Sequence, residues 1–548
     1  MSDTDMVNRN NTKRYNFHIF LVVIISVVIR WILILLNKVP FNSDEAIVGL
    51  MANHILQGET PTFFYGQAYM GSLDSYIVAG FFSLLGNTIT AIRISQTFLF
   101  VLFLVAAYYF AYILFKSRKA ALATIIILGG SPVNFLLYTT VTLGGYLEAL
   151  LIGICILILG YKIEENEDFG VRNTSTIRIQ IFLLGLFAGI GIWVLGITLI
   201  FSLSTLIMLG ISLSRKKSKF GIKMEAVTLM VAGGLLGGLP VLIYIFTNGV
   251  VVFLNELMGS AISIGSQAYF NQIGLHLVNF ILFGISAVLG FRPPWNATWL
   301  LLPLIPIILA IWLFLIRKTY IYEQKTKSEV LIRIWLPSII LMIVFVLTPF
   351  GMDPSGRYFL PINISLAFTV GLWVAIYGLQ KNKYMAPIIA VLLIYNIGGI
   401  IQAAYQSPDG ITTQFAAGTS IDHSYDQKLI NFLKESSNTL GYSTYWTAYP
   451  IVFKSNEDVI LVPVLPYHAD LKHTIRDNRY TPYSSIVDQS PNPVYITSNN
   501  PNLDRQLVMK LTESGVDWSE KLIGDYRVYY ELSRKVLPEE IGFGKNRQ

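Results

Sequence analysis

The sequence predicts a polytopic α-helical membrane protein with about eleven transmembrane helices and a soluble C-terminal α/β domain. Only 13% of the 548 residues are charged and 53% are hydrophobic, whereas an average soluble domain is about 25% charged. Between residues 17 and 404, uncharged apolar runs recur at lengths close to the roughly 20 residues that cross a bilayer core. From Gln406 onwards the chain becomes polar.

The apolar runs of the membrane part, residues 1–405, define the expected spans. They lie near residues 17–36, 88–115, 120–138, 141–161, 179–191, 194–212, 224–246, 297–316, 334–350, 358–379 and 384–404. A further run, 275–291, would move later basic residues to the other side if it crossed, so we expect it to be re-entrant or to lie at the interface. The first run is too long for a signal-peptide core and no small-residue cleavage site follows it, so we expect no removable signal peptide.

The distribution of charge predicts the orientation. Residues 1–405 hold 26 Lys and Arg against 16 Asp and Glu, a net charge of +10, and residues 406–548 hold 14 against 17, a net charge of −3. With eleven spans, 21 of the 26 basic residues fall on one side, which the positive-inside rule identifies as the cytoplasm. We therefore expect a plasma-membrane protein with a cytoplasmic N-terminus and an extracytoplasmic C-terminal domain. The formal net charge of +7 then reflects orientation and predicts no nucleic-acid partner.

The C-terminal domain, residues 406–548, alternates helical and strand patterns. Helices are expected at 426–437 and 503–514, and strands at 441–446, 451–454, 459–464, 494–498 and 526–532. Four aromatic residues lie close together in its sequence: Tyr442, Tyr445, Trp446 and Tyr449. Aromatic rings stack on sugar faces, but packing in the domain core is the favoured interpretation. The single cysteine excludes a disulfide framework.

The first outer loop, about residues 37–87, is long. Asn42 or Ser43 can cap a helix that starts at Asp44 and ends near Gly58. Apolar residues then recur at helical spacing, which favours an amphipathic helix lying on the membrane surface. A second hydrophobic stretch, 73–86, carries Asp74 at its start. His54 falls on the apolar face, which favours a packed side chain over a catalytic one.

Asp44 and Glu45 lie just outside the first span, at the interface. They are either first-turn acids that complement a helix dipole or carboxylates held where a lipid-borne substrate meets water. Glu148 lies about two turns into the fourth span and is either a buried, hydrogen-bonded acid or part of a water-lined cleft. Arg357 and Arg93 each begin a span from the outside. Each is either a snorkelling anchor or a phosphate ligand.

These residues resemble the GT-C class of membrane glycosyltransferases. The resemblance is carried by Asp44-Glu45 in the first outer loop, the stretch 65–74 (YGQAYMGSLD), Arg93, the stretch 144–148 (GGYLE) and Gly356-Arg357-Tyr358. Together with the topology, they look like the protein O-mannosyltransferase and aminoarabinose transferase-like family, which is similar to glycosyltransferase family 39. The second acid that this family commonly carries between spans three and four is not matched. That loop holds Asn134, and Glu148 and Asp74 are the available substitutes.

The resemblance implies transfer of a sugar, with inversion, from a polyprenyl-phosphate donor to a lipid, glycan or protein acceptor of the cell envelope. Asp44 would be the base, and Glu45 would orient it or share a cation. The phosphate would be bound first by Arg357 and second by Arg93. The further substrate-binding residues would be Tyr358, Glu148, Asp74 and Tyr69. Some GT-C enzymes bind a divalent cation and others do not, so Mg²⁺ or Mn²⁺ at Asp44 and Glu45 is left open.

Two other classes of function fit a polytopic chain. A transporter or lipid-linked sugar flippase places its ionisable residues near the bilayer midplane, often on broken helices in repeated halves. Here the acids gather on the outer loops and the sequence contains no visible internal repeat. A non-catalytic assembly protein would not need Asp44, Arg93 and Arg357 together. The sequence therefore favours an enzyme.

Overall fold

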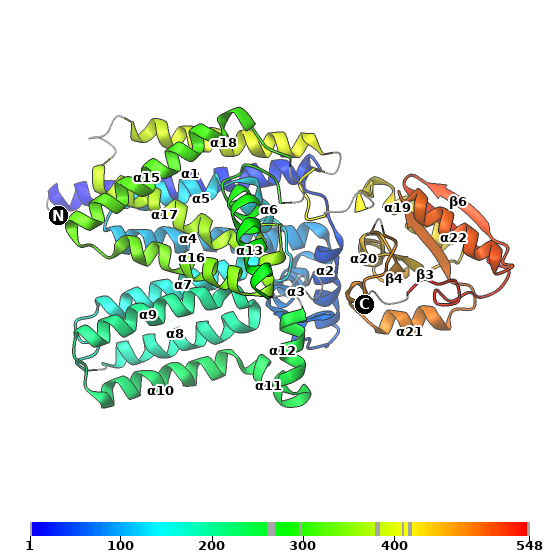
Figure 1. Cartoon of the computed structure of the whole chain (residues 1–548), viewed down its shortest axis with the longest axis horizontal. Helices are drawn as coiled ribbons and strands as arrows, with labels where there is room; N and C mark the ends of the chain where they lie inside the picture. The colour runs from blue at the N-terminus through cyan, green and yellow to red at the C-terminus, as the bar shows by residue number, and fades with distance from the viewer. Residues whose placement is uncertain are drawn as a thin grey trace.

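The computed structural model describes residues 3–172, 174–259, 269–294, 298–378, 384–407, 410–414, 419–468 and 470–544. Within these residues, ten helices are long and apolar enough to cross a membrane, or eleven if the bent pair α11 and α12 is one span. Figure 1 shows them packed side by side, with the C-terminal domain at the end of the bundle opposite the N-terminus. The expected polytopic helical protein with a C-terminal α/β domain is confirmed.

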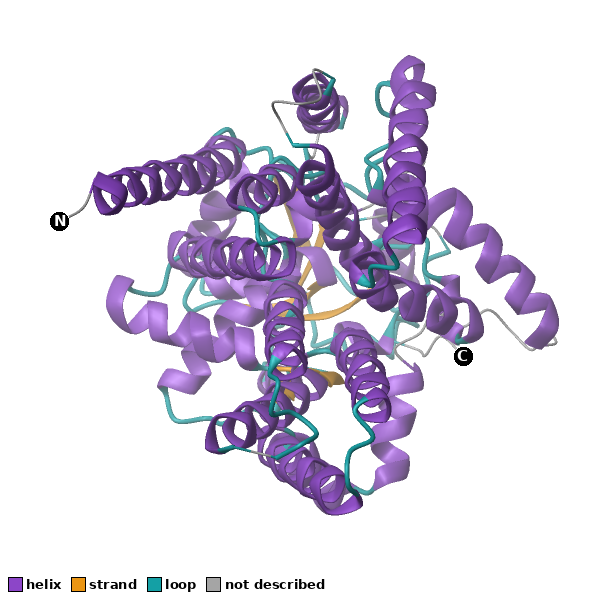
Figure 2. Ribbon diagram, turned by 90° about the vertical axis from the view of Figure 1, so that its left-hand side faces the viewer, coloured by secondary structure: helices purple, strands orange, loops and turns teal. Residues whose placement is uncertain are grey.

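Ten of the expected spans correspond to long helices. Their bounds are α1 Asp3–Leu35, α4 Ile89–Phe115, α7 Tyr146–Glu165, α8 Ser175–Val194, α9 Leu199–Arg215, α10 Phe220–Gly237, α15 Ile305–Thr326, α16 Val330–Leu347, α17 Leu360–Tyr377 and α18 Met385–Gln406. Helix α17 is the most buried of the spans, and Figure 2 shows the bundle from one end, with the strands of the C-terminal domain behind it.

The span predicted at 120–138 is not a single helix. The segment forms α5 (Arg118–Gly129) and α6 (Val133–Tyr138), which are separated at Pro132. Twelve helical residues rise about 18 Å, well short of a bilayer core of about 30 Å. The guanidinium of Arg30, buried in α1, lies 3.4 Å from the carbonyl of Gly129 and 3.2 Å from Oγ1 of Thr139. Arg30 therefore supplies donors at the break in this helix.

The apolar region after α8 also departs from straight spans. Helix α10 packs closely on α8, where a Cβ at Gly233 or Gly237 would lie 2.1 Å from a carbonyl oxygen of α8. Beyond it, α11 (Leu239–Asn248) and α12 (Val250–Gly259) meet at an angle of 114°. The run 275–291 forms α13 (Tyr269–Asn279), a π turn and α14 (Ile285–Val288), too short to count as a span. Figure 1 shows α12 and α13 crossing the bundle direction.

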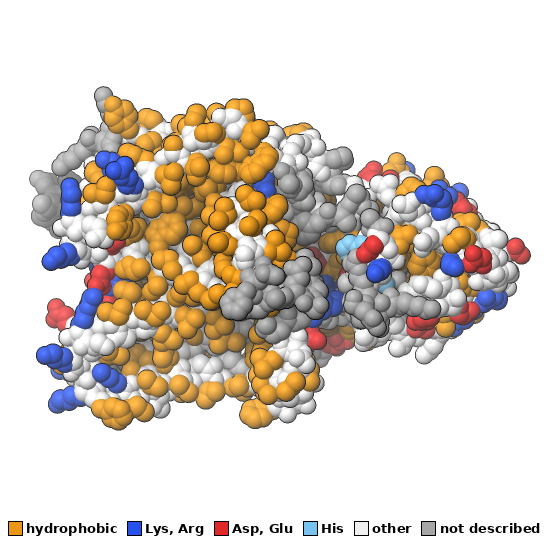
Figure 3. Space-filling model, in the orientation of Figure 1, with side chains coloured by type: hydrophobic (Ala, Val, Ile, Leu, Met, Phe, Trp, Pro, Cys, Tyr) orange, Lys and Arg blue, Asp and Glu red, His pale blue; other side chains and the backbone are white. Residues whose placement is uncertain are grey.

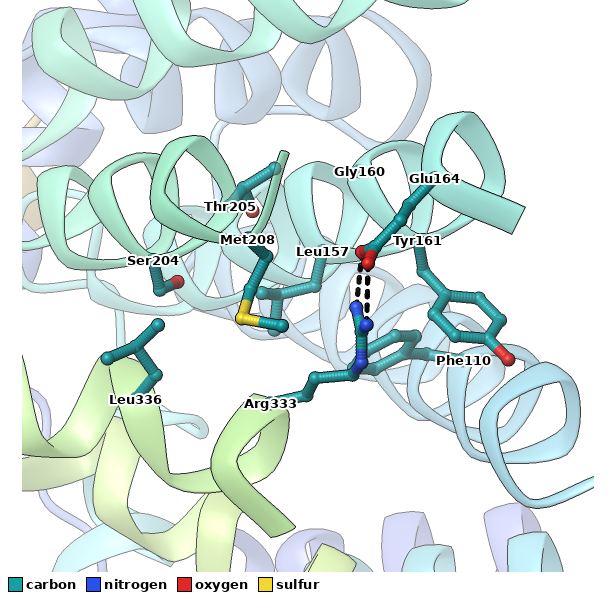
Figure 4. Close-up of a pocket in the computed structure, with 10 residues that line it drawn as sticks. All are labelled: Phe110, Leu157, Gly160, Tyr161, Glu164, Ser204, Thr205, Met208, Arg333 and Leu336. Carbon is teal, nitrogen blue, oxygen red and sulfur yellow. Dashed lines mark hydrogen bonds and ion pairs between the residues drawn. The ribbon is translucent and has the colours of Figure 1, made fainter. Parts of the chain in front are cut away.

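Ion pairs connect several helices at the end of the bundle farthest from the C-terminal domain. Lys116 pairs with Glu165, Arg215 with Glu329, and Arg333 with Glu164. Figure 3 shows Lys and Arg gathered at this end. Figure 4 shows the doubly hydrogen-bonded Arg333–Glu164 pair beside a cavity of only about 30 Å³. The loops that carry Lys116, Arg215 and Arg333 therefore share one end of the bundle.

The first outer loop forms α2 (Ser43–Leu56), β1 (Phe63–Phe64), β2 (Gln67–Gly71) and α3 (Leu73–Leu85). The expectation that α2 lies on the membrane surface is wrong. Almost all of its residues between Ser43 and His54 are buried, because α3 and α4 cover one side and α20 of the C-terminal domain covers another. The predicted helix is present, but α20, which covers its other side, is distant in the sequence: Ser43 and Tyr445 are 402 residues apart.

The C-terminal domain contains a five-stranded sheet in the order β4-β3-β5-β7-β6. The strands are β3 Leu440–Thr444, β4 Ile460–Leu465, β5 Val494–Ser498, β6 Ser519–Ile523 and β7 Tyr526–Tyr530. Strand β3 pairs in parallel with β4 and β5, and β7 pairs antiparallel with β5 and β6. The helices are α19 Asp426–Glu435, α20 Tyr445–Lys454, α21 Pro482–Gln489 and α22 Pro501–Glu513. The predicted strand at 451–454 is wrong, because those residues end α20.

Candidate active site

A cavity of about 440 Å³ lies between the bundle and the C-terminal domain. Its polar lining from the bundle consists of Asp44, Gln67, Tyr69, Tyr138, Tyr146, Arg357 and Tyr358, and its polar lining from later in the chain of Thr413, Tyr445, Trp446, Tyr467, Asp477 and Arg479. The remaining lining is almost entirely apolar and comes from the first outer loop, from residues 195–203, from α16 and from single residues elsewhere. The cavity thus combines charged groups with a large hydrophobic wall.

Asp44 lies in the first turn of α2, at the cavity wall. The side chain of Asn42 caps this helix by accepting a hydrogen bond from the backbone N–H of Glu45 at 3.1 Å. The hydroxyl of Tyr445 donates to Oδ1 of Asp44 at 2.5 Å. The hydroxyl of Ser43 donates to the carbonyl of Tyr445 at 2.7 Å. Asp44 is therefore held by residues of both domains.

Glu45 and Arg93 pair with each other behind the cavity wall. Nη2 of Arg93 lies 2.7 Å from Oε2 of Glu45, and the two side chains are 2% and 0% exposed. Arg93 also donates to the carbonyls of Val39 and Pro40 at 3.3 Å. Burial raises the pKa of Glu45 to about 7, and the guanidinium opposes that rise. The ion pair and these two hydrogen bonds thus hold the backbone of the segment that precedes Asp44 in place.

Asp44 and Glu45 do not converge on one point. Successive helical residues point about 100° apart, so Asp44 faces the cavity while Glu45 faces Arg93. Among the described residues, no group of three or more His, Cys, Asp or Glu side chains is placed to hold a metal ion. Because Asp44 and Glu45 face different ways, their carboxylates do not fit a shared cation, and the proposed reaction does not use a metal ion.

Arg357 reaches the cavity from the turn before α17. Ser355 donates its N–H to Asp353 at 2.8 Å, and Gly356 adopts a φ of +81°, which closes this turn. Nη2 of Arg357 lies 2.6 Å from Oδ2 of Asp353 and 3.3 Å from the hydroxyl of Tyr358. The side chain is 31% exposed, so one edge of the fork stays accessible from the cavity.

Asp74 and Glu148 lie behind the wall and do not line the cavity. The hydroxyl of Thr142 donates to Asp74 at 3.1 Å, and the amide of Gln96 donates to Glu148 at 3.3 Å. Burial raises the pKa of Asp74 to about 6. Both acids are adjacent to the turn that leads into Tyr146, which does line the cavity.

The structure thus sorts the sequence-predicted residues into two groups. Those that line the cavity are Asp44, Tyr69, Arg357 and Tyr358. Those that support its walls are Glu45, Asp74, Arg93 and Glu148. Asp44, Arg357 and Tyr358 each lie at the end of a predicted helix or span, whereas Tyr69 follows only from the family resemblance.

Sequence reasoning did not identify Asp477 and Arg479 as part of the site. They lie in a polar stretch whose composition is typical of an exposed loop, yet both line the cavity. For the aromatic residues Tyr445 and Trp446, the sequence favours packing in the domain core. Both are buried and line the cavity as well. No local pattern in the sequence could bring these residues to Asp44, because the contact is made between domains.

The apolar end of the cavity reaches the outer surface of the bundle. Leu199 and Leu203 of α9 and Val344 of α16 line it and are 41%, 44% and 42% exposed. Large apolar side chains on this surface face lipid in a membrane protein. The cavity therefore joins a charged region beneath the C-terminal domain to exposed apolar side chains of the bundle.

Two solved structures show the same overall fold at low sequence identity. ArnT from Cupriavidus metallidurans matches with a TM-score of 0.57 and 12% identity, over 93% of this chain and 97% of that chain. The oligosaccharyltransferase of Archaeoglobus fulgidus matches with a TM-score of 0.52 and 11% identity, over 90% of this chain and 71% of that chain. Both are GT-C glycosyltransferases, so the chain has the GT-C fold expected from its sequence.

The sequence comparisons identify no relative: no family model matches the chain, and no curated protein matches it significantly.

Proposed function

We propose that the protein is an inverting glycosyltransferase that uses a polyprenyl-phosphate-linked sugar. The observation that carries the proposal is the shape of the cavity. It joins Asp44 and Arg357 at one end to an apolar wall that opens toward lipid at the other. A donor with a charged headgroup and a long hydrocarbon chain has the same two parts. The GT-C fold adds support through fold-level analogy.

The proposed reaction needs one base and one anion-binding group. A hydroxyl or amine of the acceptor attacks the anomeric carbon of the donor, and Asp44 takes the proton that this group loses. The bond between the anomeric carbon and the phosphate oxygen breaks, and the electron pair leaves with the polyprenyl phosphate. Attack opposite the leaving group inverts the anomeric configuration. One carboxylate suffices, unlike the two that glycoside hydrolases use.

Arg357 is the proposed ligand of the departing phosphate. Guanidinium N–H groups match the spacing of two phosphate oxygens and bind them more strongly than neutral donors do. The ion pair with Asp353 orients the fork without enclosing it, since the side chain stays 31% exposed. Tyr358 and Tyr69 line the same region and offer hydroxyls to the sugar or the phosphate.

The acceptor is a lipid, glycan or protein of the cell envelope. The archaeal oligosaccharyltransferase has also been solved tethered to an acceptor peptide, with a TM-score of 0.50 to this chain. That resemblance is one of fold at 12% identity. The acceptor class is therefore to be found by assay, with lipid, glycan and peptide acceptors offered in parallel.

The test is transfer of labelled sugar from polyprenyl-phosphate donors in membranes that carry the protein or its Asp44→Asn variant. The variant keeps the size of the side chain and the hydrogen bond from Tyr445 but cannot take a proton. We expect transfer to fall by at least a hundredfold, within the range that a positioned base contributes. Equal transfer by both proteins would refute Asp44 as the base. Movement of labelled donor across the membrane without transfer would instead favour a flippase.

A further inference from the structure

Arg479 is a second arginine on the cavity wall, and it arrives from the C-terminal domain. Its backbone packs directly on the β1–β2 turn of the bundle. A Cβ placed on Gly66, which has a φ of +68°, would lie 3.1 Å from the Cα of Arg479. The close approach of the two domains at this point, together with the positive φ, therefore favours glycine.

The guanidinium of Arg479 contacts mainly neutral groups. With the Gln67 amide turned so that its oxygen faces the arginine, that oxygen accepts from Nη2 at 2.9 Å and from the hydroxyl of Tyr69 at 3.2 Å. The guanidinium also lies 5.4 Å from the ring centre of Tyr445. Among the described residues, no carboxylate lies within ion-pair distance of Arg479, and its Nε has no hydrogen-bond partner.

Asp44 and Asp477 line the same cavity and act electrostatically on Arg479 without forming an ion pair with it. A guanidinium enclosed in this way is stabilised further by an anion that binds it directly. Arg357 differs in this respect, because Asp353 already pairs with it. The two arginines reach the same cavity from different domains, and both act electrostatically on Tyr69. A phosphodiester presents two non-bridging oxygens, so two guanidinium groups can each bind one of them.

We propose that Arg479 is the second ligand of the donor phosphate, so that the C-terminal domain completes the donor site. This inference rests on the proposed function, and it assigns a substrate-binding residue outside the membrane part. The charged headgroup is then held between Arg357 of the bundle and Arg479 of the C-terminal domain, while the hydrocarbon chain follows the apolar wall.

A network of hydrogen bonds holds the segment that carries Arg479. The N–H of Arg479 donates to the hydroxyl of Tyr449 at 2.6 Å. The hydroxyl of Tyr480, the next residue, donates to Oε1 of Glu59 in the first outer loop at 2.8 Å. Tyr65 donates to Oε2 of the same carboxylate at 2.7 Å, and its ring stacks on Tyr480 with centres 4.7 Å apart.

His54 and Glu457 extend this network across the two domains. One ring nitrogen of His54 lies 2.8 Å from the hydroxyl of Tyr65, and the other lies 3.0 Å from Oε1 of Glu457. We call the five residues His54, Glu59, Tyr65, Glu457 and Tyr480 the interdomain latch. Tyr480 and Glu59 are positioning residues in this scheme, because they act on the substrate through Arg479.

The experiment measures binding of undecaprenyl phosphate to the purified full-length protein in lipid nanodiscs. Undecaprenol, which has the same chain and no phosphate, serves as the matched ligand. We expect Arg479→Gln to weaken binding of undecaprenyl phosphate by tenfold or more and to leave undecaprenol binding unchanged. Arg479→Lys keeps the charge but loses the fork, so we expect an intermediate loss. The control Arg505→Gln, on the exposed face of α22, removes an equal charge and should bind as wild type does.

Two results would overturn the assignment. Wild-type affinity of Arg479→Gln for undecaprenyl phosphate would exclude Arg479 as a ligand. An equal loss of undecaprenol binding would mean that the variant changes the cavity itself. Inorganic phosphate serves as a third ligand. Because it lacks the chain, it should compete only weakly, and competition as strong as that of the lipid would exclude a lipid headgroup as the ligand.

The latch is tested by a double-mutant cycle. We expect Tyr480→Phe to weaken undecaprenyl phosphate binding about threefold alone and to add almost nothing in the Arg479→Gln background. Additive effects would show that Tyr480 acts independently of Arg479. Binding is measured without an acceptor, so these outcomes stand apart from the transfer assay. Absence of transfer by the wild type would refute the proposed function, whereas wild-type transfer with unchanged Arg479→Gln binding would refute this inference alone.

Discussion

The hydroxyl of Tyr445 donates a hydrogen bond of 2.5 Å to Oδ1 of Asp44, across 401 residues of sequence. The donor opens α20 of the C-terminal domain and the acceptor lies in the first turn of α2 in the first outer loop. The orientation of Asp44, the proposed base, therefore depends on a hydrogen bond from the C-terminal domain.

We predict that Tyr445→Phe lowers the rate of sugar transfer by about tenfold. A hydrogen bond to a charged group contributes about 1.5–3 kcal/mol, and its loss frees Asp44 to leave the reactive orientation. Steady-state transfer measured at saturating donor would show the loss as a lower kcat. The matched control is Tyr442→Phe, which removes a hydroxyl that bonds to Asp488 and does not line the cavity. Equal rates for the two variants would contradict the role given to Tyr445.

A second prediction separates the charge of Arg357 from its geometry. Arg357→Lys keeps a positive charge but loses the planar fork, so we expect transfer to fall by tenfold to a hundredfold, with a higher KM for the donor. Asp353→Asn leaves the guanidinium in place but removes the ion pair that orients it. We expect the smaller loss from that variant. Normal donor KM in Arg357→Lys would speak against a phosphate at this position.

A third prediction concerns the buried pair of Glu45 and Arg93. Removing one partner of a buried ion pair costs about 3–5 kcal/mol, because the other charge is left without compensation. The two single variants are not equivalent. Glu45 has a pKa of about 7 and can take up a proton when alone, whereas the arginine stays charged. We therefore expect Glu45→Gln to lower the unfolding temperature more than Arg93→Met does.

The double variant Glu45→Gln with Arg93→Met is the control for this pair. Since it leaves no uncompensated charge, we expect its unfolding temperature to exceed that of Glu45→Gln alone. Thermal unfolding of the detergent-purified proteins gives this order directly. A double variant less stable than both single variants would mean that the two side chains act separately.

The membrane part was largely predictable because its physics is local in sequence. Runs of apolar residues and the placement of Lys and Arg are each read along the chain, and ten of the predicted spans form long helices. The segment 120–138 departs from a single helix because Pro132 interrupts it and Arg30, from another helix, donates hydrogen bonds at the break. Hydropathy does not reveal tertiary contacts of that kind, because it depends only on neighbouring residues in the sequence.

The C-terminal domain was harder to predict because its cavity wall is built from distant segments. Residues 451–454 have strand propensity, yet they end α20, which carries Pro450 in its interior. Burial of nearly every side chain of that helix overrides propensity. Arg479 lies in a polar stretch and gains its place through contacts with other segments, including Gly66 of the first outer loop and the hydroxyl of Tyr449. The sequence thus predicted cavity residues in the helical bundle but not those that the C-terminal domain contributes.

A fourth prediction is a loss of stability in acid that depends on Glu457. Hydrogen bonds from His54, together with one from Tyr483, outweigh burial and hold the pKa of Glu457 below its usual value of 4.5. A carboxyl whose pKa is lower in the folded protein stabilises the fold fully above the unfolded pKa, and this contribution disappears as the pH falls through the folded pKa. We therefore expect the unfolding temperature of the wild type to fall more steeply than that of Glu457→Gln between about pH 5 and pH 3. The control, Glu435→Gln, removes a carboxyl from α19 outside the latch and should follow the wild-type curve. Parallel curves for Glu457→Gln and the wild type would contradict the prediction.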